Sequence, residues 1–281
     1  MKKGINILSF PKEQRIIECI ETAKKAGFDG IELRVAEKGE LDYSSTEKEI
    51  LVIKKLAKEA ELEIPSLIAD LYWREPFTAG DKGRVKKSIS LSKEHIRIAK
   101  DIGADTVLII PGVVNTTFMQ GIEPVNYKTA YERSLAAFIE LAETAEKYKI
   151  KIGIENVWNM FLTSPLEMKD FIEKIGSQYA GVYLDVGNVL FNGLPEHWID
   201  ILGKTIKRVH LKDFKYSVGN VNGFVDLLEG DVNWPAVMSS LKKTGYDGYL
   251  IAEMLPPYRF FPEQRIYNTS KAMDKIMSLG G

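Results

Sequence analysis

The sequence predicts a single (β/α)8 barrel, the TIM-barrel architecture, over residues 1–281. Short apolar segments alternate with helical patterns eight times along the chain. No shift in composition divides the chain, and its 281 residues match the size of single α/β barrels. An open sheet that binds a dinucleotide is disfavoured, because no G-x-G-x-x-G motif follows the first apolar segment.

The first half of the chain contains four predicted strand–helix units. The strands are expected at Gly4–Phe10, Phe28–Val35, Ile64–Leu71 and Thr106–Ile110. Helices are expected from Pro11 to Gly27, from about Thr46, before Gly103, and from Tyr127 to Tyr148. Thr46 and Glu49 have the spacing of a capping box, in which each side chain accepts a hydrogen bond from the other's backbone.

The second half repeats the pattern four more times. The strands are expected at Lys151–Glu155, Ala180–Asp185, Ile206–His210 and Tyr249–Glu253. Helices are expected from Ser164, near Pro195, from Asn233 to Gly245, and from about Pro262. A long glycine-containing connection, 215–231, follows the seventh strand, and we expect it to form a lid or wall over a pocket.

Four consecutive predicted strands end on residues that commonly bind metals: Glu155, Asp185, His210 and Glu253. Any one of them alone would be ordinary as a helix cap, a surface charge or a core histidine. In a barrel the carboxyl ends of the strands meet at one mouth, where catalytic residues lie. Three carboxylates and one imidazole suit a divalent ion, and without a cation between them the carboxylates would repel one another. The pattern predicts a metal site.

Composition limits the other possibilities. A net charge of −1 provides no electrostatic reason to expect nucleic acid or a membrane surface as a partner. The single cysteine, Cys19, excludes an intramolecular disulfide and a multi-cysteine zinc site, and we expect it to be buried. His95 and His197 lie among charged residues, which predicts surface positions. The amino-terminal sequence lacks the pattern of a signal peptide, and we expect a cytoplasmic protein.

Several motifs resemble those of the xylose isomerase-like barrel superfamily, in particular its sugar (phosphate) isomerase/epimerase branch, which includes ketose 3-epimerases. The motifs are Ile154-Glu155-Asn156, Leu184-Asp185-Val186-Gly187-Asn188, Val209-His210-Leu211-Lys212-Asp213 and Ala252-Glu253-Met254. The resemblance implies that Glu155, Asp185, His210 and Glu253 bind one divalent metal ion. It also implies that the two glutamates are the catalytic acid and base. We expect Mn²⁺, with Mg²⁺, Co²⁺ or Zn²⁺ as alternatives.

The chain departs from the family pattern in two places. Asn188 stands where tagatose-type epimerases usually carry a histidine three residues after the aspartate. Lys215 and Tyr216 stand where the family has a substrate-contacting arginine after the metal-binding histidine. We expect substrate contacts from Asn188, from Lys212 and Lys215 as partners of a phosphate or hydroxyl group, and from Trp158 as aromatic cover.

These observations favour a ketose or ketose-phosphate 3-epimerase that works through an enediolate, with Glu155 and Glu253 on opposite faces of the sugar. An aldose–ketose isomerase and a polyol (inosose-type) dehydratase remain alternatives, because the same metal and bases serve all three. A non-catalytic sugar-binding barrel is less favoured, since binding alone needs no second glutamate. The expected partners are a small sugar or sugar phosphate and further copies of the chain, as a dimer or tetramer.

Overall fold

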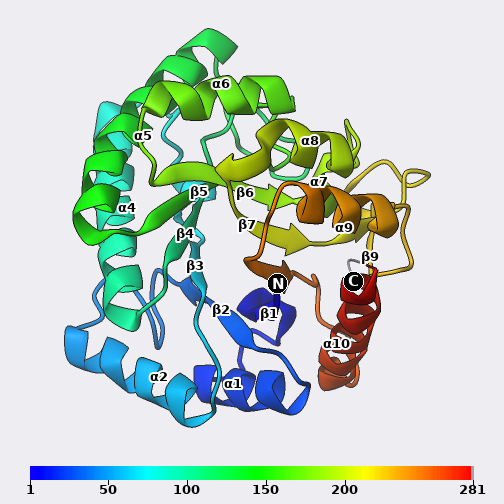
Figure 1. Cartoon of the computed structure of the whole chain (residues 1–281). Helices are drawn as coiled ribbons and strands as arrows, with labels where there is room; N and C mark the ends of the chain where they lie inside the picture. The colour runs from blue at the N-terminus through cyan, green and yellow to red at the C-terminus, as the bar shows by residue number, and fades with distance from the viewer. Residues whose placement is uncertain (280–281) are drawn as a thin grey trace.

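The computed structural model describes residues 1–279, and its centre is a closed barrel of eight parallel strands (Figure 1). The last two residues of the predicted domain, 280–281, lie outside the described residues. Strands that follow one another in the chain are neighbours, and β1 pairs with β10 to close the barrel. The barrel strands are β1 (Lys2–Asn6), β2 (Gly30–Val35), β3 (Ser66–Ala69), β4 (Thr106–Ile109), β5 (Lys151–Glu155), β6 (Ala180–Asp185), β7 (Ile206–Leu211) and β10 (Tyr249–Ala252). The predicted barrel is confirmed.

Helices form the outer layer around the strands (Figure 1). The α-helices are α1 (Ile16–Lys25), α2 (Glu47–Glu59), α3 (Leu71–Arg74), α4 (Lys82–Ile102), α5 (Tyr127–Tyr148), α6 (Pro165–Ile175), α7 (Val186–Val189), α8 (Pro195–Leu202), α9 (Trp234–Lys243) and α10 (Pro262–Ser278). The predicted capping box is confirmed, because the Glu49 carboxylate accepts a hydrogen bond from the Thr46 amide at 2.7 Å. Ser164 caps α6, with Pro165 as its first residue.

Several predicted boundaries were wrong, and three of them lie at the ends of β1 and β3 and at the start of α1. The first strand stops at Asn6, because the Asn6 side chain accepts a hydrogen bond from the Leu8 amide and starts a 3-10 turn, η1 (Ile7–Ser9). The first helix begins at Ile16 rather than Pro11, since Glu40 accepts the free amide of Ile16 at 2.7 Å. The third strand stops at Ala69, and the residues after Asp70 form the short helix α3.

The amino end of the barrel is closed by a buried arginine. Arg208 on β7 pairs with Asp105 and donates hydrogen bonds to Thr106 and to the Pro65 carbonyl.

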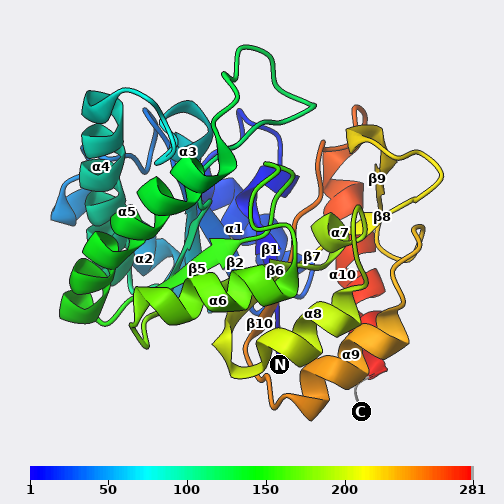
Figure 2. The ribbon, with the colours of Figure 1, turned by 90° about the horizontal axis from the view of Figure 1, so that it is seen from above.

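Longer connections between strands and helices lie at the carboxyl end of the barrel. In Figure 2 the loop after β4 rises on the same side of the barrel as the hairpin of β8 (Asp213–Phe214) and β9 (Phe224–Val225). The 3-10 turn η3 (Val221–Gly223) and β9 lie within the connection predicted after the seventh strand, 215–231. Another 3-10 turn, η2 (Gly203–Thr205), precedes β7.

The surface position predicted for His95 was wrong. His95 is fully buried on the inner face of α4, and its Nδ1 lies 3.0 Å from the Tyr72 hydroxyl. Its charged sequence neighbours lie on the outer face of the same helix. The sequence around His95 is therefore polar even though the histidine itself faces inward. The other two expectations are confirmed, since Cys19 is buried and His197 is exposed. None of the helices within 1–279 is long and apolar enough to cross a membrane.

We expect His95 to make stability depend on mild acid. Burial lowers the pKa of His95 from 6.5 to about 3, so the unfolded chain takes up a proton below pH 6.5 that the folded chain refuses. The free energy of unfolding is therefore highest above pH 6.5 and falls as the pH is lowered. At pH 5 the loss due to His95 should be about 2 kcal/mol. Urea denaturation at pH 7.5 and 5.0 should show a smaller loss for His95→Gln. Equal losses in the two proteins would contradict this assignment.

Candidate metal centre

The four strand-end residues meet at the mouth of the barrel. Glu155 and Asp185 are the last residues of β5 and β6, His210 lies near the end of β7, and Glu253 directly follows β10. All four are buried, and one ligand atom from each lies within 4.8 Å of the other three. The Nδ1 atom of His210 is 3.5, 3.8 and 3.9 Å from oxygens of Glu155, Asp185 and Glu253.

These positions fit a bound divalent ion. Two ligands held at about 2.1 Å from one ion are at most about 4.2 Å apart, and the three nitrogen–oxygen separations fall below that limit. His210 Nδ1 is buried without a hydrogen-bond partner in the described part of the chain, and Asp185 Oδ2 faces only the Lys212 ammonium, 3.0 Å away. Buried polar atoms rarely lack a partner, and a metal ion would provide one for His210 Nδ1. One nitrogen and three carboxylates form a donor set that Mn²⁺, Co²⁺ or Zn²⁺ can accept.

A buried glutamate that the sequence analysis missed orients the histidine. Glu32 on β2 lies 2.7 Å from the Nε2 atom of His210 on the side away from the quartet. Its carboxylate also accepts hydrogen bonds from Asn6, Ser66 and Tyr183. With Nε2 donating to Glu32, the Nδ1 atom faces the three carboxylates, as metal-binding histidines require. The signal was available, since Glu32 stands between Ile31 and Leu33 in a predicted buried strand, where a carboxylate is unusual.

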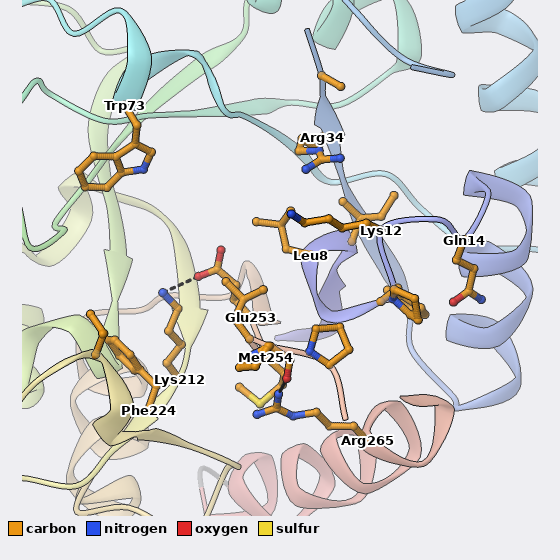
Figure 3. Close-up of a pocket in the computed structure, with 18 of the residues that line it drawn as sticks. Leu8, Lys12, Gln14, Arg34, Trp73, Lys212, Phe224, Glu253, Met254 and Arg265 are labelled. Carbon is orange, nitrogen blue, oxygen red and sulfur yellow. Dashed lines mark hydrogen bonds and ion pairs between the residues drawn. The ribbon is translucent and has the colours of Figure 1, made fainter. Parts of the chain in front are cut away.

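A cavity of about 990 Å³ opens beside the quartet. Glu155, Glu253, Asn188, Trp158 and Lys212 are among its lining residues. Figure 3 shows Glu253 and Lys212 with Phe224 and Trp73 around the same opening. The predicted wall is confirmed, because residues 221, 222, 224 and 225 line the cavity.

The predicted substrate contacts fall in different places. Trp158 donates a hydrogen bond to the Asn188 carbonyl at 3.0 Å, and the Asn188 amide donates to the Asn156 carbonyl. The Asn188 side chain therefore also braces the strand ends. Lys215 is half-buried at the base of the hairpin, outside the set of residues that line the cavity.

Residues 20–276 match the sequence pattern of the xylose isomerase-like TIM barrels. The chain belongs to this family. A relative, SgbU of Escherichia coli strain K12, provisionally named as an L-ribulose-5-phosphate 3-epimerase, is 27% identical over 264 residues, covering 89% of this chain and 87% of SgbU. A solved D-psicose 3-epimerase has a TM-score of 0.81 at 18% identity, with 100% of both chains covered. The IolI protein, solved with a zinc atom, has a TM-score of 0.82 at 20% identity, covering 99% of this chain and 98% of IolI.

In this family member an internal cation lies against the quartet. The Lys212 ammonium is 2.5 Å from Glu253 Oε2 and 3.0 Å from Asp185 Oδ2, and its side chain is only 14% exposed. Gly187 makes this approach possible, because a Cβ atom there would lie 2.5 Å from the Lys212 Cβ. In the metal-free chain Lys212 therefore neutralises part of the carboxylate charge, a role that the sequence analysis did not foresee.

The two glutamates have different proton affinities in the metal-free chain. Burial raises the pKa of Glu155 to about 7, against the opposing effect of His210. Burial would also raise the pKa of Glu253, but the charges of Lys212 and His210 outweigh it and lower that pKa below its usual value. Burial disfavours a charged His210, yet Glu32 and Glu253 raise its pKa well above the ordinary range. Two carboxylates with separated pKa values are typical of an acid/base pair.

We expect Lys212→Met to destabilise the metal-free protein and to enlarge its stabilisation by metal. The substitution keeps the apolar stem but leaves two carboxylates without their cation, and breaking a buried charge pair typically costs about 3–5 kcal/mol. Melting temperatures with EDTA and with Mn²⁺ would measure both effects. Lys215→Met, a half-buried lysine outside the quartet, is the matched control. A gain on Mn²⁺ addition no larger than that of the unmodified protein would contradict this role.

Proposed function

We propose that the chain is a divalent-metal-dependent ketose 3-epimerase, an isomerase acting on a small sugar or sugar phosphate. The observation that carries the proposal is the presence of two buried glutamates, Glu155 and Glu253, at opposite ends of a four-residue metal site beside a cavity. The names of the relative SgbU and of the structurally similar D-psicose 3-epimerase, which describe 3-epimerases of ketoses, support the same reaction.

The residues divide the work between binding and proton transfer. In this proposal Asp185 and His210 serve as metal ligands, whereas Glu155 and Glu253 hold the metal and also move a proton. The ion, which we propose to be Mn²⁺, supplies Lewis-acid stabilisation of negative charge on the sugar oxygens. One glutamate removes the proton from C3, which leaves an enediolate. The other glutamate returns a proton to the opposite face of C3, so that the carbon is inverted.

The cavity walls provide the surroundings that this chemistry needs. Trp158 packs against Phe224 with ring centroids 5.0 Å apart, and Phe214 lies behind both rings. An apolar wall beside the carboxylates limits water and strengthens the electrostatic interactions inside the site. We propose that Asn188, Trp158, Lys212 and Lys215 contact the substrate, Lys215 only if the hairpin closes over the cavity.

The decisive experiment follows deuterium from solvent into the sugar. The metal-loaded protein is incubated in D₂O with ketopentoses, ketohexoses and their terminal phosphates. Deuterium at C3 together with inversion of C3 would support the epimerase. Label at C1 or C2 with an aldose product would indicate an isomerase, and loss of water from a cyclic polyol would indicate a dehydratase. Exchange that persists in the Glu155→Gln/Glu253→Gln double variant would show that another protein in the sample is responsible.

A further inference from the structure

The end of the cavity formed by β2 and the loop before α1 carries an excess of cationic side chains. Lys12, Arg15, Arg34 and Lys38 line this end, against the carboxylates of Glu13 and Glu40. Glu40 already accepts the Ile16 amide, and Arg15 pairs with Glu18, so these residues are engaged elsewhere. Figure 3 shows Lys12 extending over Leu8 toward Arg34, across the opening from Lys212 and Trp73.

The guanidinium of Arg34 has N–H donors that no protein group within residues 1–279 accepts. Its guanidinium meets one oxygen of Asp70 at 3.3 Å, an ion pair that holds the side chain in place, and its side chain is 28% exposed. Within residues 1–279 the guanidinium makes no hydrogen bond to another protein group. A guanidinium carries five N–H donors, and such donors in a largely shielded side chain usually find partners. Those facing the cavity are available to a ligand.

Lys12 brings a second positive charge to the same place. It forms no ion pair with any residue in the described range. Its amino group nevertheless extends toward the guanidinium of Arg34 (Figure 3). Two cations directed at one space repel each other unless an anion lies between them. A guanidinium fork beside an ammonium group is well suited to a phosphate dianion.

The two ends of the cavity also differ in the charge of the residues that line them. At the quartet end a bound divalent ion and Lys212 would offset the three carboxylates, whereas the Lys12 and Arg34 end carries an excess of positive charge that would attract a phosphate. The volume of about 990 Å³ lies at the upper end of the range for small-molecule pockets, more than an unsubstituted pentose requires. A substrate with a carbonyl at one end and a phosphate at the other matches both ends.

We propose that Lys12 and Arg34 bind the terminal phosphate of a phosphorylated ketose and so make the enzyme selective for ketose phosphates. The proposal rests on the proposed function, because it uses the same cavity and takes the quartet as the reaction centre. The phosphate holds the far end of the sugar, which places the carbons next to the carbonyl against Glu155 and Glu253.

The test compares phosphorylated and free ligands on the Mn²⁺-loaded protein. In kinetics, kcat/KM is measured for a ketopentose 5-phosphate and for the free ketopentose. In calorimetry, binding is measured for the unreactive pentitol 5-phosphate, the free pentitol and inorganic phosphate. The variants are Lys12→Gln, Arg34→Gln and Arg34→Lys. Arg74→Gln is the matched control, an exposed arginine that pairs with Glu37 outside the cavity.

We expect Arg34→Gln and Lys12→Gln each to weaken pentitol 5-phosphate binding and to lower kcat/KM for the phosphorylated ketose, by roughly 10- to 100-fold. The values for unphosphorylated ligands should stay unchanged, Arg34→Lys should recover part of the loss, and Arg74→Gln should have no effect. Lys12 is on an exposed loop, so its variant tests the idea even if Arg34→Gln fails to fold.

The proposal is overturned if the unmodified protein binds pentitol 5-phosphate no better than pentitol, or if the variants weaken free and phosphorylated ligands equally. The binding measurement needs no turnover, so it separates this proposal from the proposed function. Selective phosphate binding without any exchange of sugar protons would support the phosphate site and reject the epimerase. Epimerisation of free ketoses without any preference for phosphorylated ones would support the epimerase and reject the phosphate site.

Discussion

Glu155→Gln and Glu253→Gln should each slow epimerisation by at least about 10²–10⁴-fold, the usual contribution of a general acid or base. Glutamine keeps the size of the side chain and one oxygen ligand but cannot accept the proton. Both side chains are buried at the quartet and line the cavity in which we propose that the sugar binds. The rate of inversion at C3, measured with metal and substrate at saturation, is the quantity to compare.

Isotope exchange distinguishes the two roles. For a given substrate epimer, the variant that lacks only the acid should still exchange the C3 proton with D₂O, without inversion, whereas the variant that lacks the base should do neither. Asp185→Asn is the matched control, because its loss of activity should be recovered by excess Mn²⁺ if Asp185 is only a ligand. Either glutamine variant epimerising at a near-normal rate would remove that glutamate from the mechanism.

Glu32→Gln should weaken Mn²⁺ binding by about 10–100-fold, although Glu32 is not one of the four ligand residues and contacts only the far side of His210. The Glu32 carboxylate accepts hydrogen bonds from four buried groups, and glutamine would turn an amide donor toward some of these donors. His210 then loses the partner that fixes its ring. Leaving buried donors unpaired should also cost about 1–3 kcal/mol of folding stability each.

Calorimetric titration with Mn²⁺ and urea denaturation would measure the two effects. Glu63→Gln is a suitable control, because Glu63 pairs with Lys2 at the opposite end of the barrel and is 57% exposed. If Glu32→Gln bound Mn²⁺ as tightly as the Glu63→Gln control, His210 would not depend on Glu32 for its orientation.

Much of the candidate metal centre could be predicted because a barrel repeats one local pattern. Each strand reads as a short apolar run, and the residue that ends the run lies at the mouth whichever strand it belongs to. The positions of Glu155, Asp185, His210 and Glu253 therefore followed from counting units, without knowledge of which strands touch. The caps at Thr46 and Ser164 were predictable for a similar reason, since their partners lie three residues away.

Two of the boundaries that were wrong depended on the surrounding structure rather than on the local pattern. The first helix starts at Ile16 because Glu40, on a later loop, accepts its amide. The apolar pattern of the third strand continues to Leu71, but the chain turns into α3 where the barrel ends. A local pattern shows which residues are apolar, not where a neighbouring element interrupts them.

The sequence alone was enough to determine the barrel and the four ligand-type residues at its mouth, because both depend on short-range periodicity. Only the tertiary structure showed that Glu32 lies behind His210, 178 positions away, that Lys212 pairs with the quartet, and that Lys12 and Arg34 share one end of the cavity. These features depend on which side chains face each other across the barrel. Alternation along a strand separates inward from outward positions, but the partner across the interior is set by the closure of all eight strands.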